Sequence, residues 1–163
     1  MLKRLIWVVV AAVFFAFQLN ISSVGALELN EGARTVQLNG GGEEVIVSLQ
    51  DVKEGQRLFV NACSYCHNGG RTKTNPNVTL GLADLAGAEP PRDNIVAIVD
   101  YLKNPKTYDG EDDISLFHPN TTRSDLYSEM RNLTDDDLEA LAGYILVQSN
   151  VRGITWGKGK ELN

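Results

Sequence analysis

The stretch Cys63-Ser64-Tyr65-Cys66-His67 contains both cysteines of the chain. Two cysteines at this spacing, followed directly by histidine, are typical of a site where a c-type haem is attached. The two thiols can bond to the two vinyl groups on one edge of a porphyrin, and the histidine is then held beneath the iron as its proximal ligand. The pattern predicts one covalently bound haem c, with thioethers at Cys63 and Cys66 and with His67 on the iron.

Two other interpretations of the pattern are weaker. A structural zinc site needs four ligands, and only one further histidine, His118, is present in the whole chain. A redox-active dithiol has no need of His67 and usually occurs in a βαβ setting, which the sequence does not suggest.

Residues 1–26 have the pattern of a secretory signal peptide. Lys3 and Arg4 precede an apolar run from Leu5 to Phe17, and small residues lead to a cleavage position after Ala26. Cleavage there leaves residues 27–163 as the mature domain, in which no further segment resembles a transmembrane span. The alternative is an uncleaved anchor, although the apolar run is short for one. Export agrees with haem attachment, because that reaction takes place across an energy-transducing membrane.

The chain of 163 residues carries a net charge of −6, and removing Lys3 and Arg4 makes it more acidic still. This length suits one domain. The acidic balance argues against binding to nucleic acid or to an anionic lipid surface. A basic or mixed-charge protein surface is the better-matched partner.

Hydrophobic periodicity predicts a mostly α-helical domain with an N-terminal β-hairpin. The hairpin lies within residues 27–50, with strands at 35–38 and 45–49 and a turn rich in glycine. Helices are expected at 51–62, 93–103, 123–130 and 135–148, with N-caps at Asp51, Ser124 and Thr134, and a weakly helical segment at 82–88. Loops are expected at 68–81 and 106–120, and residues 151–163 form an aperiodic tail.

The sixth position of an iron held by His67 has two candidate ligands, His118 and Met130. His118 lies in a loop between Phe117 and Pro119. Met130 precedes the Thr134 cap by four residues, where many small cytochromes place an axial methionine. A thioether favours Fe(II) and raises the reduction potential, whereas a second imidazole lowers it. The pattern of residues leaves this choice open.

Longer motifs carry a resemblance to a known family. Gly55 and Phe59 in the first helix, with Leu141 and Tyr144 in the last, resemble the crossing helices of the class I cytochrome c fold. The segments 72–76, 90–95, 103–111, 118–119 and 130–134 are similar to the cytochrome c-550 family, which comprises extrinsic haem subunits of photosystem II in cyanobacteria and some algae.

The resemblance implies a low-potential, low-spin haem with two axial histidines, His67 and His118, and with Met130 packed nearby as a non-ligand. It also implies a place in the thylakoid lumen, on the lumenal subunits of photosystem II. There the protein would stabilise the oxygen-evolving manganese–calcium cluster and its calcium and chloride requirement. Such a protein is not an enzyme. The tail from Trp156 to Asn163 departs from the family, which usually ends in a pair of tyrosines.

Two other functions remain alternatives. A small acidic c-type cytochrome also suits a soluble, diffusible electron carrier. A haem enzyme would need an open sixth position, and nothing near His118 resembles a distal acid–base set.

Overall fold

The structure is a computed structural model that describes residues 29–158. The predicted signal peptide and the last five residues of the tail lie outside the described residues. As predicted, the described part is mostly helical with a small two-stranded hairpin. Its elements are α2 (Glu31–Arg34), β1 (Thr35–Gln37), β2 (Glu44–Ile46), α3 (Leu49–Ala62), α4 (Ser64–His67), η1 (Asn68–Gly70), α5 (Leu82–Ala86), α6 (Ile95–Lys103), η2 (Ser128–Met130), α7 (Asp135–Arg152) and η3 (Gly153–Thr155).

The hairpin is shorter than predicted. Strands β1 and β2 pair antiparallel, with Thr35 opposite Ile46. The predicted hairpin segment 27–50 is wrong at both ends, because residues 31–34 form the unexpected helix α2 and α3 already begins at Leu49. Val47, just beyond β2, is buried and reaches α7, where a side chain on Gly143 would meet it at 3.0 Å. The hairpin therefore leans on the helical core.

The first long helix ends at Ala62 as predicted, but its predicted start is wrong. The N-cap is Ser48 rather than Asp51, and the Ser48 hydroxyl accepts a hydrogen bond from the Asp51 backbone N–H at 3.0 Å. Asp51 is thus the third residue of the helix, where its carboxylate accepts from the Ser48 hydroxyl at 2.6 Å. A serine followed three residues later by an acid is itself a capping signal.

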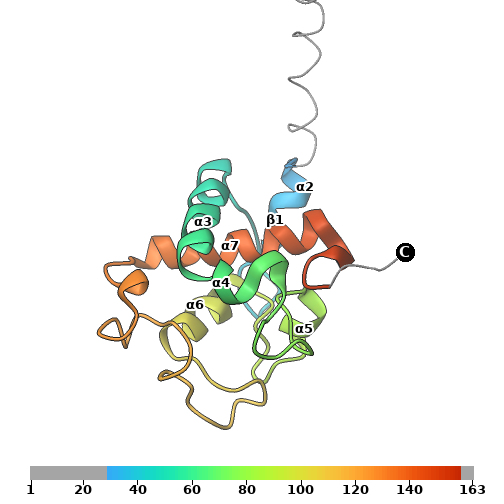
Figure 1. The fold of residues 1–163 in the computed structure, drawn as a ribbon. Coiled ribbons are helices and arrows are strands. Elements are labelled where there is room, and N and C mark those ends of the chain that lie inside the picture. Colours follow the sequence, from blue (N-terminus) through green and yellow to red (C-terminus); the bar gives the residue numbers. More distant parts are fainter. Residues whose placement is uncertain (1–28, 159–163) are drawn as a thin grey trace, which may run out of the picture. The chain divides into compact units, whose positions relative to one another are not determined.

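Helix α3 lies across α7 (Figure 1), and the crossing depends on Gly55. A Cβ atom at Gly55 would lie 2.0 Å from the carbonyl oxygen of Ala140 and 2.7 Å from Cβ of Tyr144. Only glycine allows the two backbones to approach this closely. Phe59, one turn along α3, packs against Tyr144 with ring centroids 5.4 Å apart.

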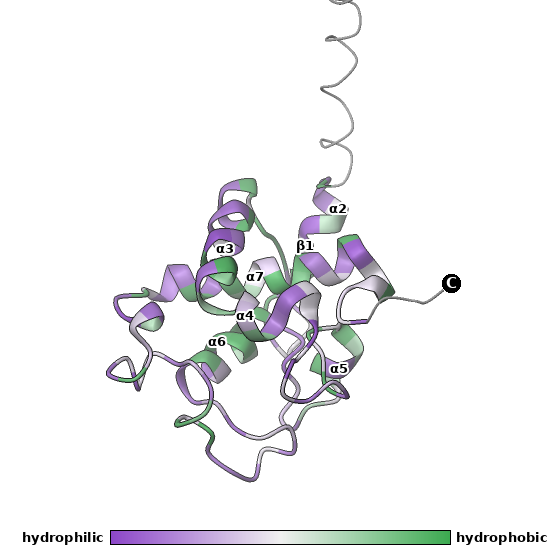
Figure 2. Cartoon of the chain, viewed as in Figure 1, coloured by the Kyte–Doolittle hydropathy of each residue, from purple (hydrophilic) through white to green (hydrophobic). Residues whose placement is uncertain are grey.

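Helix α7 begins as predicted and continues four residues further. Thr134 and Asp137 form a reciprocal capping box. Every residue from Ala140 to Ser149 is buried, so α7 is the centre of the core and other elements cover it on several sides. In Figure 2, α6 is mostly green, whereas α3 alternates between purple and green along its length, as expected for a helix with one exposed face.

The segment between α6 and α7 differs most from prediction. Helix α6 begins at Ile95 with Asn94 as its cap, close to the predicted start. The predicted helix at 123–130 is wrong, and Ser124 is not a cap. Only a turn at residues 123–127 and the short η2 form there, and the Asn120 side chain accepts the Arg123 N–H at 2.8 Å at the start of this turn.

The first part of the predicted aperiodic tail has regular structure. Its first residues belong to α7 and η3, and Trp156 is buried. The indole N–H of Trp156 donates to the Leu80 carbonyl at 2.9 Å, and its ring lies 5.8 Å from that of Phe59. The prediction of an aperiodic tail from residue 151 is therefore wrong up to Trp156.

Candidate haem site

The predicted attachment motif forms one tight helical turn directly after α3. The backbone N–H groups of Cys66 and His67 both bond to the carbonyl of Cys63, at 3.1 and 2.8 Å. Residues three and four apart on a helix lie on the same face. The turn therefore presents the two thiols and the imidazole on one side, as attachment to one porphyrin requires.

The surroundings of Cys63 disfavour a redox dithiol. Burial, with a smaller contribution from the Glu129 charge, raises the pKa of the Cys63 thiol to about 12. Reactive cysteine pairs instead have lowered pKa values that expose a thiolate. A zinc site has no better support, because residues 29–158 contain no cluster of three or more His, Cys, Asp or Glu side chains placed to hold a metal ion.

His118 lies in the irregular chain between α6 and α7, in a turn closed by its backbone N–H bond to the Ile114 carbonyl at 2.9 Å. The fold brings this loop histidine to the attachment motif. The ring centroids of His67 and His118 are 6.2 Å apart. Metal–nitrogen bonds to histidine are about 2 Å long and each ring centre lies roughly 1 Å behind its nitrogen, so imidazoles on opposite sides of one metal have centroids roughly 6 Å apart. The two rings fit an iron held between them.

The second nitrogen of each ring also fits this arrangement. Nδ1 of His118 lies 2.9 Å from the Pro119 carbonyl, which can only accept, so Nδ1 carries the proton and Nε2 carries the lone pair. Nδ1 of His67 lies 3.3 Å from the Thr72 hydroxyl. Metal-binding histidines commonly donate their other N–H in this way, which orients the ring.

Burial keeps both imidazoles neutral, and a neutral imidazole is the form that binds metal. Burial lowers the pKa of His67, and burial together with the nearby His67 lowers the pKa of His118 to about 4.

Met130, the other candidate ligand, is fully buried in η2, a segment that packs against α3. Its burial agrees with a role in the core, which methionine fills well. The described structure pairs the ring of His67 with that of His118.

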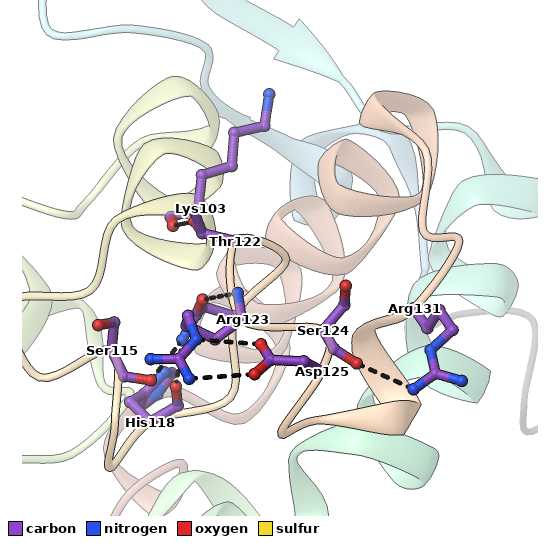
Figure 3. A network of polar contacts seen from close by, with 9 residues as sticks. Lys103, Ser115, His118, Thr122, Arg123, Ser124, Asp125 and Arg131 are labelled. Atoms are coloured by element: carbon purple, nitrogen blue, oxygen red, sulfur yellow. Dashed lines mark hydrogen bonds and ion pairs between the residues drawn. The ribbon is translucent and has the colours of Figure 1, made fainter.

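The backbone around His118 is fixed by a side chain that no sequence pattern singles out. Asn120 is completely buried and donates to the carbonyls of Ser115 and His118, at 2.9 and 2.7 Å. Its own oxygen accepts the Arg123 N–H. Figure 3 shows how this network continues from His118 to Arg123 and then to Asp125, whose carboxylate accepts two bonds of 3.0 Å from the guanidinium.

Comparison with known proteins agrees with this site. A family profile described as the cytochrome c-550 domain matches residues 27–162. The chain is 56% identical to "Photosystem II extrinsic protein V" of Picosynechococcus sp. over 99% of this chain and 95% of the relative. It is 57% identical to the protein of that name from Aphanothece halophytica, over the whole of both chains.

Two solved structures are also similar. The crystal structure of cytochrome c549 superposes with a TM-score of 0.77 and 51% identity, covering 78% of this chain and 99% of that one. The PsbV2 cytochrome of Thermosynechococcus elongatus gives a TM-score of 0.65 and 37% identity, covering 76% of this chain and 88% of that one. With this sequence similarity, this fold and this family profile, the chain belongs to the cytochrome c-550 family.

Proposed function

We propose that this chain carries one haem c, attached through Cys63 and Cys66, with its iron between His67 and His118. The observation that carries the proposal is the 6.2 Å separation of the two imidazole rings, with both Nδ1 atoms turned to other partners. When bound, such a haem takes up and releases one electron at the iron. Ligation by two imidazoles, rather than by imidazole and thioether, implies a low reduction potential.

Optical and electron paramagnetic resonance (EPR) spectra of the mature holoprotein test the ligands directly. We expect the EPR signal of a low-spin ferric haem with two imidazoles, and its loss in His118→Ala. The matched variant Met130→Leu should keep the wild-type spectra, because this substitution conserves volume and costs less than about 1.5 kcal/mol in a core. A methionine-to-iron charge-transfer band in the wild type would overturn the assignment of His118.

We propose further that the protein is an extrinsic subunit on the lumenal side of photosystem II. Its relatives are named as extrinsic proteins of that complex, and the family comprises electron-transfer cytochromes rather than enzymes. In this position it would stabilise the manganese–calcium cluster and its calcium and chloride requirement. None of the helices between residues 29 and 158 has the length and apolar composition needed to cross a bilayer.

A lumenal location depends on export and on removal of residues 1–26. Intact-mass measurement of the purified native protein tests both steps at once. We expect the mass of residues 27–163 plus one haem. A mass that retains residues 1–26 would contradict cleavage, and a mass without haem would contradict covalent attachment.

Two charged surfaces are candidates for the contact with photosystem II. In the acidic loop 109–113, Asp109 and Asp113 shape the loop by accepting bonds from Thr107 and Ser115, and all four acidic residues of the loop are exposed. On the other surface, a hollow of about 530 Å³ beside Cys66 is lined by Arg71 and Lys73 and by no acidic residue. Lys158 follows Gly157 at the edge of this hollow, and Lys160 lies outside the described residues.

Depletion and rebinding tests the subunit role. Photosystem II membranes stripped of this protein should lose oxygen evolution in medium low in calcium and chloride, and the wild-type protein should restore it. Lys73→Glu should rebind less well than Lys53→Glu, a matched charge reversal on α3 outside the hollow. Unchanged oxygen evolution after depletion would favour the alternative, a diffusible electron carrier.

A further inference from the structure

An aromatic side chain from α6 touches the distal histidine. The ring of Tyr101 meets the ring of His118 edge-on, with centroids 4.9 Å apart and planes 65° apart. Burial raises the pKa of the Tyr101 phenol, so the ring is neutral and largely shielded from water. T-shaped contacts are the geometry that aromatic rings prefer. Tyr101 therefore restricts the rotation of the imidazole, in addition to the hydrogen bond to the Pro119 carbonyl.

An arginine held in place by hydrogen bonds lies over the Tyr101 ring. The guanidinium carbon of Arg92 is 4.1 Å from the Tyr101 ring centroid. The guanidinium also donates to the carbonyls of Lys106 and Thr107, at 3.2 and 2.6 Å. These bonds fix the planar group against the tyrosine, and a cation stacked on an aromatic ring is attracted to it. Contacts therefore run from Arg92 to Tyr101 and from Tyr101 to His118.

The charge of Arg92 also acts on His118. Arg92 contacts Tyr101, and Tyr101 contacts His118, so the guanidinium charge lies one side chain away from the proposed ligand. A half-buried arginine is always protonated, and its field is screened less than that of an exposed charge. The positive charge of Arg92 therefore disfavours a further positive charge on an iron bound to His118.

We propose that Tyr101 and Arg92 are positioning residues for the distal ligand: Tyr101 sets the orientation of the His118 ring, and Arg92 holds Tyr101 and raises the reduction potential of the site. The inference rests on the proposed ligation by His118. Two consequences follow. Loss of the Tyr101 ring frees the imidazole to rotate and to leave the iron. Loss of the Arg92 charge favours the oxidised state, which carries one more positive charge.

The first test compares three tyrosine variants as holoproteins. Tyr101→Leu should shift the ferric EPR g-values and tighten carbon monoxide binding to the reduced protein about three- to tenfold, because His118 must leave before carbon monoxide binds. Tyr101→Phe keeps the ring and should behave like the wild type. The matched control Tyr108→Leu should also leave both signals unchanged, since the Tyr108 hydroxyl bonds to the Asp84 carbonyl instead.

The second test measures the reduction potential of Arg92→Gln and remains decisive if Tyr101→Leu does not fold. Arg92→Gln should have a lower potential than the wild type, at low ionic strength and at high. Arg152→Gln is the matched control, because Arg152 also stacks on an aromatic ring, Trp156, but is exposed. It should leave the potential nearly unchanged.

The outcomes separate the inference from the proposed function. Methionine ligation in the wild type would overturn both. Two imidazoles in the wild type, with EPR and carbon monoxide binding unchanged in Tyr101→Leu or a potential unchanged in Arg92→Gln, would overturn the positioning role alone.

Discussion

The two sides of the candidate site are built in different ways. The proximal side, which carries the cysteines and His67, follows directly on α3, and α3 is fixed by its backbone contact with α7 at Gly55. The distal side, which carries His118, lies in irregular chain between α6 and α7. Three polar side chains fix the position of this irregular segment. Asn120 bonds to a carbonyl within the segment, and Arg92 and Thr122 bond to carbonyls near the end of α6.

Each of the two histidines is therefore sensitive to a different kind of substitution. Close helix packing depends on shape, so the proximal side should fail when volume is added at the crossing. A loop without a regular hydrogen-bond ladder depends on individual buried polar groups, each of which is costly to leave unpaired. The distal side should therefore fail when one amide is removed.

The largest effect is expected at the helix crossing. Gly55→Val places new atoms where Cβ alone would lie 2.0 Å from a backbone carbonyl, so α3 and α7 must separate. We expect a loss of about 3 kcal/mol or more in the free energy of unfolding, or failure to mature with haem. Gly40→Ala is the control, because a Cβ there meets nothing within 4 Å. Equal stability of the two variants in a denaturant titration would contradict this account of the crossing.

The next effect is expected at the loop amide. Asn120→Ala leaves two part-buried carbonyls and one N–H without their partner and should cost about 2 kcal/mol. Because the released carbonyl belongs to His118, we also expect tighter carbon monoxide binding to the reduced holoprotein. The exposed Asn77→Ala serves as the control. A variant that loses stability without any change in carbon monoxide binding would show that Asn120 stabilises the fold without holding His118 in place.

A smaller effect is expected at the helix caps, and it should be alike on the two crossing helices. Ser48→Ala and Thr134→Ala each remove a side-chain oxygen that accepts a bond near a helix start. Each should cost about 1 kcal/mol, measured by urea unfolding. Neither substitution should alter the EPR spectrum, because caps stabilise the helices without touching the imidazoles. A spectral change in Thr134→Ala would link α7 directly to ligand geometry.

The smallest effect is a pH dependence at the start of α7. The backbone N–H of Thr134, and then its hydroxyl, hold the pKa of Asp137 below its usual value of 3.8. A carboxyl with a lowered pKa in the folded state stabilises the protein fully above its unfolded pKa, and this contribution is lost as pH falls through the folded pKa. The difference in Tm between wild type and Asp137→Ala should therefore shrink between pH 6 and pH 2, as followed by circular dichroism. A constant difference would exclude the carboxylate as its source.

Elements that are formed by contacts between residues close together in the chain were predicted correctly. The Thr134 cap and the start of α7 were predicted correctly because the capping box joins residues three apart. The cysteine spacing predicted the attachment turn for the same reason. The helix predicted at 123–130 was wrong: the segment contains a turn and η2, and Thr122 beside it bonds to the Lys103 carbonyl, a contact that no local pattern shows.

The amino-acid sequence was enough to predict the helical class and the attachment turn, because both depend on spacing along the chain, whereas the close crossing at Gly55 was implied only by the family resemblance. The sequence left His118 and Met130 as competing ligands until the family resemblance was considered. The rings of His67 and His118 approach to 6.2 Å only in the folded protein, where Tyr101 contacts His118 and Arg92 contacts Tyr101. Contacts between residues so far apart in sequence leave no local pattern, since they form only when the core around α7 has assembled.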